Sequence, residues 1–218
     1  MMKATYRTPD AFFVSAAGRR VQEQIKDALS PLSLQGRSAA LFGNVFPFLA
    51  AFDQNTPDIV SETNFFSKTE DPAFLLKPQS LDLFFISALD SCLIDALPRL
   101  IKEAFSALKA GGILIPLIKN KKLFDTLSIN QTSETNASAL TGQLSENGFS
   151  LKNRKGLLHF PYASRFFETA DNLLFSLNIG GGCFTLLSAV KNPTVIEKIE
   201  NYSSTRITKA SVFTSPRT

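Results

Sequence analysis

The sequence predicts an α/β fold in which helices cover both faces of a mostly parallel β-sheet. The segment 80–89, "SLDLFFISAL", is a continuous apolar run of strand length, typical of a parallel strand with both faces buried. A helical apolar repeat follows over 95–109, and "ILIPLI" at 113–118 supplies a further buried strand. Strand, helix and strand form a βαβ unit, which implies a parallel pair joined by a right-handed crossover.

The helix of this unit carries its own sequence signals. Its apolar positions recur at helical spacing, at Leu97, Leu100, Ile101, Ala104, Phe105 and Leu108. Lys109 is expected in the last turn, and Gly111 is expected to stop the helix.

The chain begins with a predicted amphipathic helix over 8–30. Thr8 is a candidate N-cap, and Pro9 takes the first helical position. Apolar residues then recur at helical spacing, at Phe12, Phe13, Ala16, Ala17, Val21, Ile25 and Ala28. We therefore expect one continuous helix up to Pro31.

A strand, a helix and a second strand are expected next. The apolar segment 38–43 ends at Gly43 and predicts the first strand. "FPFLAAF" at 46–52 is apolar enough for a buried helix, and "DIVSE" at 58–62 reads as a short strand that ends on Glu62.

The C-terminal half adds strands and helices to the same sheet. The expected elements are a polar surface excursion over 119–136, a helix over 137–147 capped by Asn147 and Gly148, a strand over 149–160, a helix over 163–177 and a final strand over 183–192. The helix over 163–177 carries one apolar face made of Phe166, Phe167, Ala170, Leu173, Leu174 and Leu177.

The composition indicates a single domain and argues against several classes of protein. The chain has 218 residues, 44% of them hydrophobic, which suits one domain with a real core. Its net charge of +4 is scattered, so we expect no nucleic-acid partner. The two cysteines have no metal-ligand spacing, so we expect no metal. Without a signal peptide or an apolar run of spanning length, we expect a cytoplasmic protein with no transmembrane segment.

The order of elements resembles the class I S-adenosylmethionine-dependent methyltransferases. The specific part is "LLKPQSLDLFFISALDSCLIDALPRLIKEAFSALKAGGILI", in which 80–82 and 108–112 match the family's motifs around its fourth and fifth strands. Weaker resemblance extends over about 8–192. It implies a Rossmann-like, seven-stranded, mostly parallel sheet with helices on both faces and an antiparallel final strand.

This resemblance implies a domain plan. A methyltransferase-like domain occupies 1–192, and a polar C-terminal tail occupies 193–218. Within the domain, the parts are an N-terminal helix at 8–30, the cofactor-half βαβ units at 38–118, a variable excursion and helix at 119–147, and C-terminal strands and a helix at 148–192.

The resemblance also implies a site for S-adenosylmethionine at the carboxyl ends of the strands. Gly43 matches the first glycine of motif I and is followed by Asn44. Glu62 matches the acidic residue that holds the ribose, Glu70 or Asp71 falls near the position that contacts the adenine amine, and Ser87, Ala88 and Leu89 end the strand that lines the methionine side.

Motif I departs from the family's glycine-rich pattern. Val45 and Pro47 stand at glycine positions, and Leu41 replaces the acidic residue. Val45 obstructs close approach of a ligand to the backbone, and Pro47 removes a backbone donor. These losses favour weak or absent cofactor binding.

Two functions stay open on the sequence alone. The chain is a methyltransferase that acts on a small-molecule or protein acceptor, or a catalytically inactive methyltransferase-like binding or assembly subunit with a protein partner. No catalytic residue can be assigned. His159, the only histidine, is either a base or, more in keeping with its lack of a placed partner, a structural residue.

Overall fold

We describe a computed structural model of the chain, in which residues 9–54, 57–63, 76–89, 91–120, 137–160 and 165–193 are described. Six strands form one sheet in the order β2-β1-β3-β4-β6-β5. They are β1 Ser38–Gly43, β2 Asp58–Thr63, β3 Leu81–Ala88, β4 Leu108–Lys119, β5 Phe149–Leu157 and β6 Phe184–Lys191. All six match predicted strands.

The sheet is mostly parallel, as predicted. β1 pairs in parallel with β2 and β3, and β3 pairs in parallel with β4. β6 lies antiparallel between β4 and β5, which confirms the antiparallel final strand. Seven strands were expected and six occur in the described part of the chain; residues 64–75, between β2 and β3, lie outside it.

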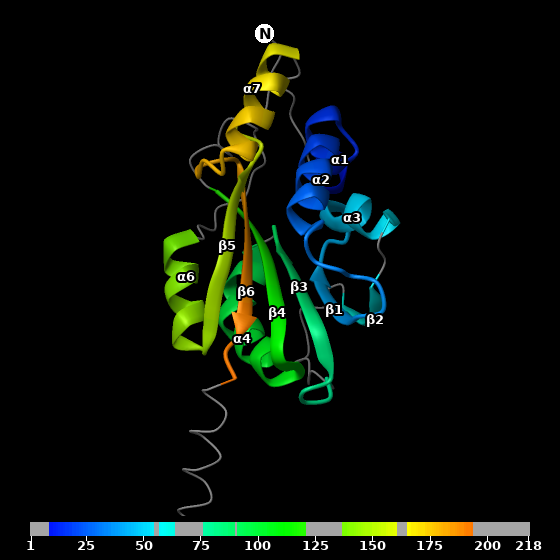
Figure 1. Cartoon of the computed structure of the whole chain (residues 1–218), viewed down its shortest axis with the longest axis vertical. Coiled ribbons are helices and arrows are strands. Elements are labelled where there is room, and N and C mark those ends of the chain that lie inside the picture. The colour runs from blue at the N-terminus through cyan, green and yellow to red at the C-terminus, as the bar shows by residue number, and fades with distance from the viewer. Residues whose placement is uncertain are drawn as a thin grey trace, which may run out of the picture.

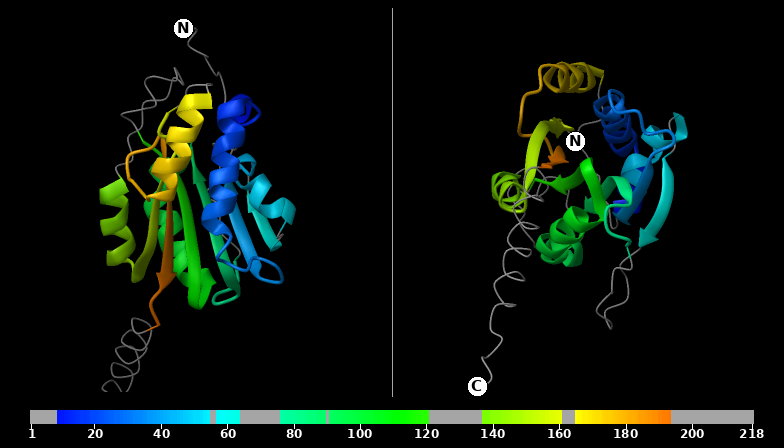
Figure 2. Two further views of the ribbon diagram at one scale, coloured as in Figure 1. Left: turned by 45° about the horizontal axis from the view of Figure 1, so that its top comes forward. Right: turned by 60° about the horizontal axis from the view of Figure 1, so that its bottom comes forward.

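Helices cover both faces of the sheet (Figure 1). The helices are α1 Pro9–Phe13, α2 Ala16–Leu29, η1 Phe46–Phe48, α3 Leu49–Gln54, α4 Ser91–Ala107, α6 Ala137–Glu146 and α7 Arg165–Ser176. One apolar core unites α1, α2, η1, α3 and part of α7 with one face of the sheet, and a second unites α4 and α6 with the other. Figure 2 shows α2 and α7 on the side of the sheet opposite α4.

The prediction of one continuous helix over 8–30 is wrong, because the structure has two helices there, α1 and α2. The helix breaks at Val14 and Ser15, and Ser15 caps α2 by accepting a hydrogen bond from the Gly18 backbone. Phe12 and Phe13, the last two residues of α1 before the break, are both buried, and each packs against Phe184.

The end of α4 also differs from the prediction. The helix ends at Ala107, and Lys109 and Gly111 belong to β4 instead of the last helical turn and its stop. Gly111 keeps a positive φ of 76°, within the irregular start of β4. The buried Lys191 ammonium of β6 donates to the Phe105 carbonyl in the last turn of α4 and to the Leu108 carbonyl at the start of β4. The Ser106 and Ala107 carbonyls accept from the Gln79 and Ser80 N–H groups. Because these partners come from distant parts of the chain, the sequence around α4 could not reveal where the helix ends.

The other helical predictions hold. The helix over 137–147 is α6, and Gly148 follows it with a φ of 82°. η1 and α3 together occupy the predicted 46–52 helix. Residues 121–136 of the predicted excursion lie outside the described residues, as does the tail beyond 193, and the domain boundaries stay predictions.

Candidate functional site

The candidate site is the edge of the sheet where the parallel strands end. Gly43, the last residue of β1, pairs with Ser87 of β3. Gly43 has a φ of 92°, and a Cβ atom there would lie 2.6 Å from the Ser87 carbonyl oxygen and 2.6 Å from Leu93 Cδ1. Both the conformation and the lack of space therefore require glycine at this position.

The turn after Gly43 is held by hydrogen bonds within the chain. The Asn44 side chain donates to the Asp10 carboxylate of α1, and Asn44 Oδ1 accepts from the Phe46 backbone N–H at 2.8 Å. Gln22 Nε2 of α2 donates to the Phe46 carbonyl oxygen at 2.8 Å. Helices α1 and α2 thus hold the turn from one side.

The second half of this turn bonds its backbone donors inside the chain. The N–H of Phe46 is bonded to Asn44, that of Phe48 donates to the Val45 carbonyl at 2.9 Å, and that of Leu49 donates to the Phe46 carbonyl. Pro47 has no N–H. From Phe46 to Leu49 the backbone therefore offers no free donor to a ligand.

Some of the other predicted site residues lie at this edge of the sheet, and others lie outside the described part of the structure. Ser87, Ala88 and Leu89 lie at the same edge and are buried. The Glu62 backbone pairs with Leu41 near the end of β2, but its side chain is not among the described atoms. Glu70 and Asp71 lie outside the described residues.

Two features of this edge bear on ligand binding in opposite ways. Leu41, at the position where the family has an acidic residue, is fully buried in the apolar core. In contrast, the Ser87 hydroxyl is buried and finds no hydrogen-bond partner in the described part of the chain. An unpartnered buried hydroxyl costs stability unless something satisfies it.

A second polar cluster, which the sequence reading missed, joins α2 to α7. Asp171 of α7 is fully buried, and its Oδ2 accepts from Gln24 Nε2 at 2.9 Å and lies 3.7 Å from the Arg20 guanidinium. Gln24 Oε1 in turn accepts from the Leu158 N–H at 2.9 Å. His159 Nδ1 lies 3.3 Å from Asp171 Oδ1.

His159 has a structural role in this cluster. Nε2 lies 2.7 Å from the Ile179 carbonyl oxygen, so both ring nitrogens face acceptors inside the protein. The Asp171 hydrogen bond raises the pKa of His159 against the opposing effect of burial. An imidazole with both nitrogens engaged is poorly placed to act as a base. Sequence spacing could not reveal Asp171 as its partner, because only the fold places α7 beside the end of β5.

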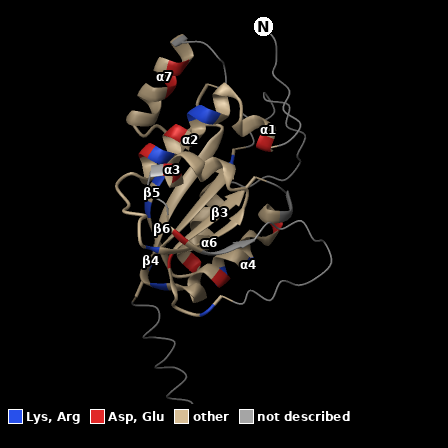
Figure 3. Cartoon of the chain, turned by 90° about the vertical axis from the view of Figure 1, so that its right-hand side faces the viewer, with Lys and Arg blue, Asp and Glu red and all other residues tan. Residues whose placement is uncertain are grey.

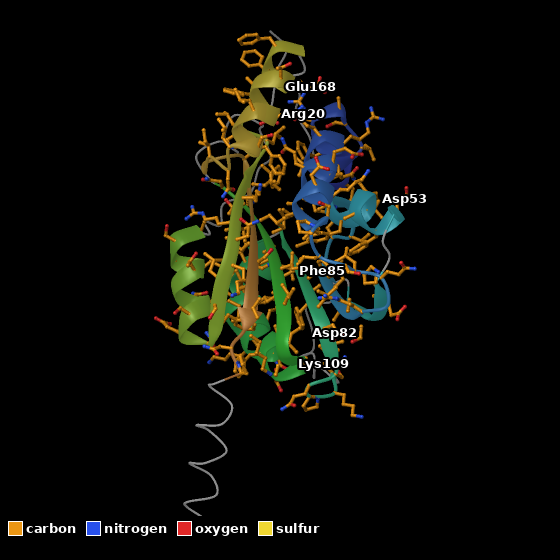
Figure 4. All side chains as sticks on the ribbon, in the orientation of Figure 1. Arg20, Asp53, Asp82, Phe85, Lys109 and Glu168 are labelled. Carbon is orange, nitrogen blue, oxygen red and sulfur yellow. The ribbon has the colours of Figure 1, made fainter. Side chains whose placement is uncertain are left out.

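A cavity of about 580 Å³ lies between α2 and α7 beside this cluster. Its lining residues include Arg19, Arg20, Glu23, Asp27, Glu168 and Asn172. Figure 4 labels Arg20 and Glu168 at this end of the molecule, and Figure 3 shows basic and acidic residues on α2 and acidic residues on α7. None of the predicted site residues lines this cavity.

The described residues offer neither a metal-ligand cluster nor a membrane-spanning helix. No group of three or more His, Cys, Asp or Glu side chains there could hold a metal ion. No helix in the same residues is long and apolar enough to cross a membrane. The Cys183 thiol is buried and free, and burial raises its pKa to about 12.

Comparisons with known proteins identify the fold. No protein-family model matches the sequence, and no curated protein does so significantly. Among solved structures, the chain is similar to a SAM-dependent methyltransferase from Archaeoglobus fulgidus, with a TM-score of 0.52 and 16% identity over 78% of this chain and 94% of that one.

Two further solved structures agree. The S-adenosylmethionine-dependent methyltransferase from Mesorhizobium loti gives a TM-score of 0.53 with 15% identity, over 78% of this chain and 97% of that one. A SAM-dependent methyltransferase from Thermotoga maritima gives 0.54 with 17% identity, over 84% and 94%. With its parallel sheet and antiparallel β6, this chain has the fold of the class I S-adenosylmethionine-dependent methyltransferases.

Proposed function

We propose that this chain is a methyltransferase-like binding or assembly subunit that does not bind S-adenosylmethionine with ordinary affinity. One observation carries the proposal: from Phe46 to Leu49 the turn after Gly43 offers no free backbone donor, because Pro47 has no N–H and the other three N–H groups bond inside the chain. Ligands at this crevice depend on such amides and on close approach to the backbone. Val45 and Pro47 remove the close approach, and the buried Leu41 supplies no charge for the methionine amine.

The outer face of α7 supports the binding role. Phe166, Leu173 and Leu177 expose 76%, 58% and 62% of their surface, and Ile179 after the helix exposes 44%. Contiguous apolar residues on a protein surface often mark an interaction site. This surface, the α7 apolar stripe, is the candidate contact face for a protein partner.

Activity as a methyltransferase is the second candidate, and one observation favours it. Gly43 has a positive φ, and the buried Ser87 hydroxyl beside it, which has no hydrogen-bond partner among the described residues, could bond to a ligand. Methyl transfer needs little more from a protein than alignment of the acceptor with the activated methyl group. In that case a small-molecule or protein acceptor would bind at the same edge.

Calorimetric titration with S-adenosylmethionine and S-adenosylhomocysteine separates the two functions. We expect no heat of binding for either compound at millimolar concentration. Binding at micromolar concentration would contradict the proposal and favour the methyltransferase.

A double variant tests whether the turn is the cause. Val45→Gly combined with Pro47→Gly restores glycine at both positions and should allow binding that the parent chain lacks. Thermal unfolding of both proteins serves as the folding control. A folded variant that still shows no binding would indicate that the turn is not what limits affinity.

A further inference from the structure

Helix α7 is attached to the rest of the molecule in an unusual way. Its apolar stripe faces outward, while its fully buried residue is the acid Asp171, with Phe175 at 9% exposure beside it. Most surface helices bury an apolar stripe instead. The position of α7 therefore rests on Phe175 in the apolar core and on the polar contacts of one carboxylate.

Those contacts come from two other parts of the chain. Gln24 of α2 donates to Asp171 Oδ2, and the His159 backbone N–H, in the segment after β5, donates to Oδ1. Arg20 of α2 lies 3.7 Å from Oδ2 and also donates to the Phe160 carbonyl at 3.3 Å. A buried carboxylate is tolerated only when donors surround it in this way.

The surroundings of the His159 ring favour its protonated form, because both ring nitrogens face hydrogen-bond acceptors. Nδ1 faces the Asp171 carboxylate at 3.3 Å, and Nε2 faces the Ile179 carbonyl at 2.7 Å. Neither oxygen can donate a hydrogen bond. A neutral imidazole has one N–H, so one ring nitrogen would present a lone pair to an oxygen, whereas the imidazolium donates from both.

We propose that His159 and Asp171 form a pH-sensitive latch, in which the protonated imidazole holds α7 against α2 and β5 and its deprotonation weakens that attachment. The inference rests on the contacts of α7 alone and is independent of the proposed function. Weakening the latch would change the cavity between α2 and α7 and the presentation of the α7 apolar stripe.

The neighbouring groups set the direction of the effect. The Asp171 hydrogen bond raises the pKa of His159, and burial opposes it. Burial raises the pKa of Asp171, but hydrogen bonds from His159 and Gln24 outweigh it and lower the pKa overall. Arg20 from α2 adds a second cation near Asp171, and the Cys183 thiol, with a pKa of about 12, stays neutral.

The outer charges lie further from the ring. Lys155 of β5 lies over the Phe175 ring at 4.7 Å from its centroid, and Glu168 of α7 is exposed beside the cavity. The stabilisation from His159 is fully present below its unfolded pKa of about 6.5 and is lost as pH rises through the raised folded pKa. The Asp171 contribution is lost only in acid, as pH falls through its lowered folded pKa.

The experiment uses the full chain, in which His159 is the only histidine, so NMR resolves one imidazole titration. We expect a His159 pKa above 6.5, together with loss of hydrogen-exchange protection in α7 over the same pH range after correction for intrinsic exchange. The protection should fall by about tenfold for each pH unit by which the folded pKa exceeds the unfolded one.

Two variants on the same helix complete the test. Asp171→Asn should lower the His159 pKa and remove the pH dependence of α7 protection, whereas Glu168→Gln, at an exposed position, should change neither. A His159 pKa at or below 6.5, or α7 protection that stays constant through the titration, would overturn the latch. Should Asp171→Asn fail to fold, the parent titration and the Glu168→Gln control decide the question.

Discussion

The two ends of this sheet differ in what they keep of the methyltransferase pattern. At the amino end, Ser38, Asp82 and Lys109 start β1, β3 and β4 and are joined by hydrogen bonds and an ion pair. At the carboxyl end, Gly43 is retained with a positive φ, but the turn after it lacks the later glycines and bonds the Phe46 N–H inside the chain. Figure 4 labels Asp82 and Lys109 at the end of the molecule opposite Arg20 and Glu168.

This difference separates the scaffold role of a motif from its ligand role. The residues that carry the resemblance most specifically, at 80–82 and 108–112, meet at the amino end, where Leu81 pairs with Leu108 and Lys109 Nζ lies 2.8 Å from Asp82 Oδ1. These contacts fix the register of adjacent strands and lie at the opposite edge of the sheet from the candidate site at Gly43. A chain can keep them for stability while its ligand-binding turn changes.

The largest expected effect concerns the carboxyl end. Gly43→Ala should lower the free energy of unfolding by about 2–4 kcal/mol, because it adds both a strained φ and a contact with the Ser87 backbone. Gly36→Ala is the matched control, since Gly36 has a φ of 70° and open space around it, and should cost about 1–2 kcal/mol. Urea unfolding measures both. Equal losses would show that close packing against Ser87 contributes nothing.

A smaller effect is expected at the amino end. Asp82→Asn should lower the free energy of unfolding by about 1 kcal/mol, because it weakens bonds to Ser38 and to the half-exposed Lys109. Burial raises the pKa of Asp82, but the hydrogen bonds from Lys109 and Ser38 outweigh it and lower the pKa. This contribution is present above the unfolded pKa and lost as pH falls through the lowered folded value.

The pH dependence provides the check on this pair. The difference in stability between the parent chain and Asp82→Asn should shrink as pH falls into the acid range. Asp53→Asn, at an exposed position on α3, is the control and should show no such trend. A difference that stays constant at low pH would mean that the Asp82 charge contributes nothing.

The smallest effect is expected on the α7 apolar stripe, beyond the carboxyl end. Leu173→Ser should change the free energy of unfolding by less than about 0.5 kcal/mol, since the side chain is 58% exposed. Leu100→Ser, at a fully buried position of α4, is the contrast and should destabilise strongly. A large loss in the free energy of unfolding for Leu173→Ser would indicate that this stripe stabilises the fold and is not a free contact surface for a partner.

The strands could be predicted from the sequence because burial on both faces requires apolar residues at nearly every position. The run at 80–89 and the strand at 113–118 are buried on both faces, so they contain apolar residues at nearly every position. The sequence also indicated one apolar face of the 163–177 helix, and the structure leaves Phe166, Leu173 and Leu177 of that face exposed while its other members are partly buried. Periodicity marks which residues share a face, but it does not determine which face the core covers.

The sequence by itself determined the α/β class, the strand order along the chain, the resemblance to the methyltransferase fold and the loss of motif I glycines at Val45 and Pro47. Only the tertiary structure decided that α1 separates from α2, that Lys191 bonds to the last turn of α4, and that Asp171 lies buried beside His159. The polar contacts among these join distant parts of the chain, since Lys191 and Phe105 are 86 positions apart and Gln24 and Asp171 are 147 apart. Local sequence patterns report burial and conformation, whereas such contacts depend on how the whole chain closes on itself.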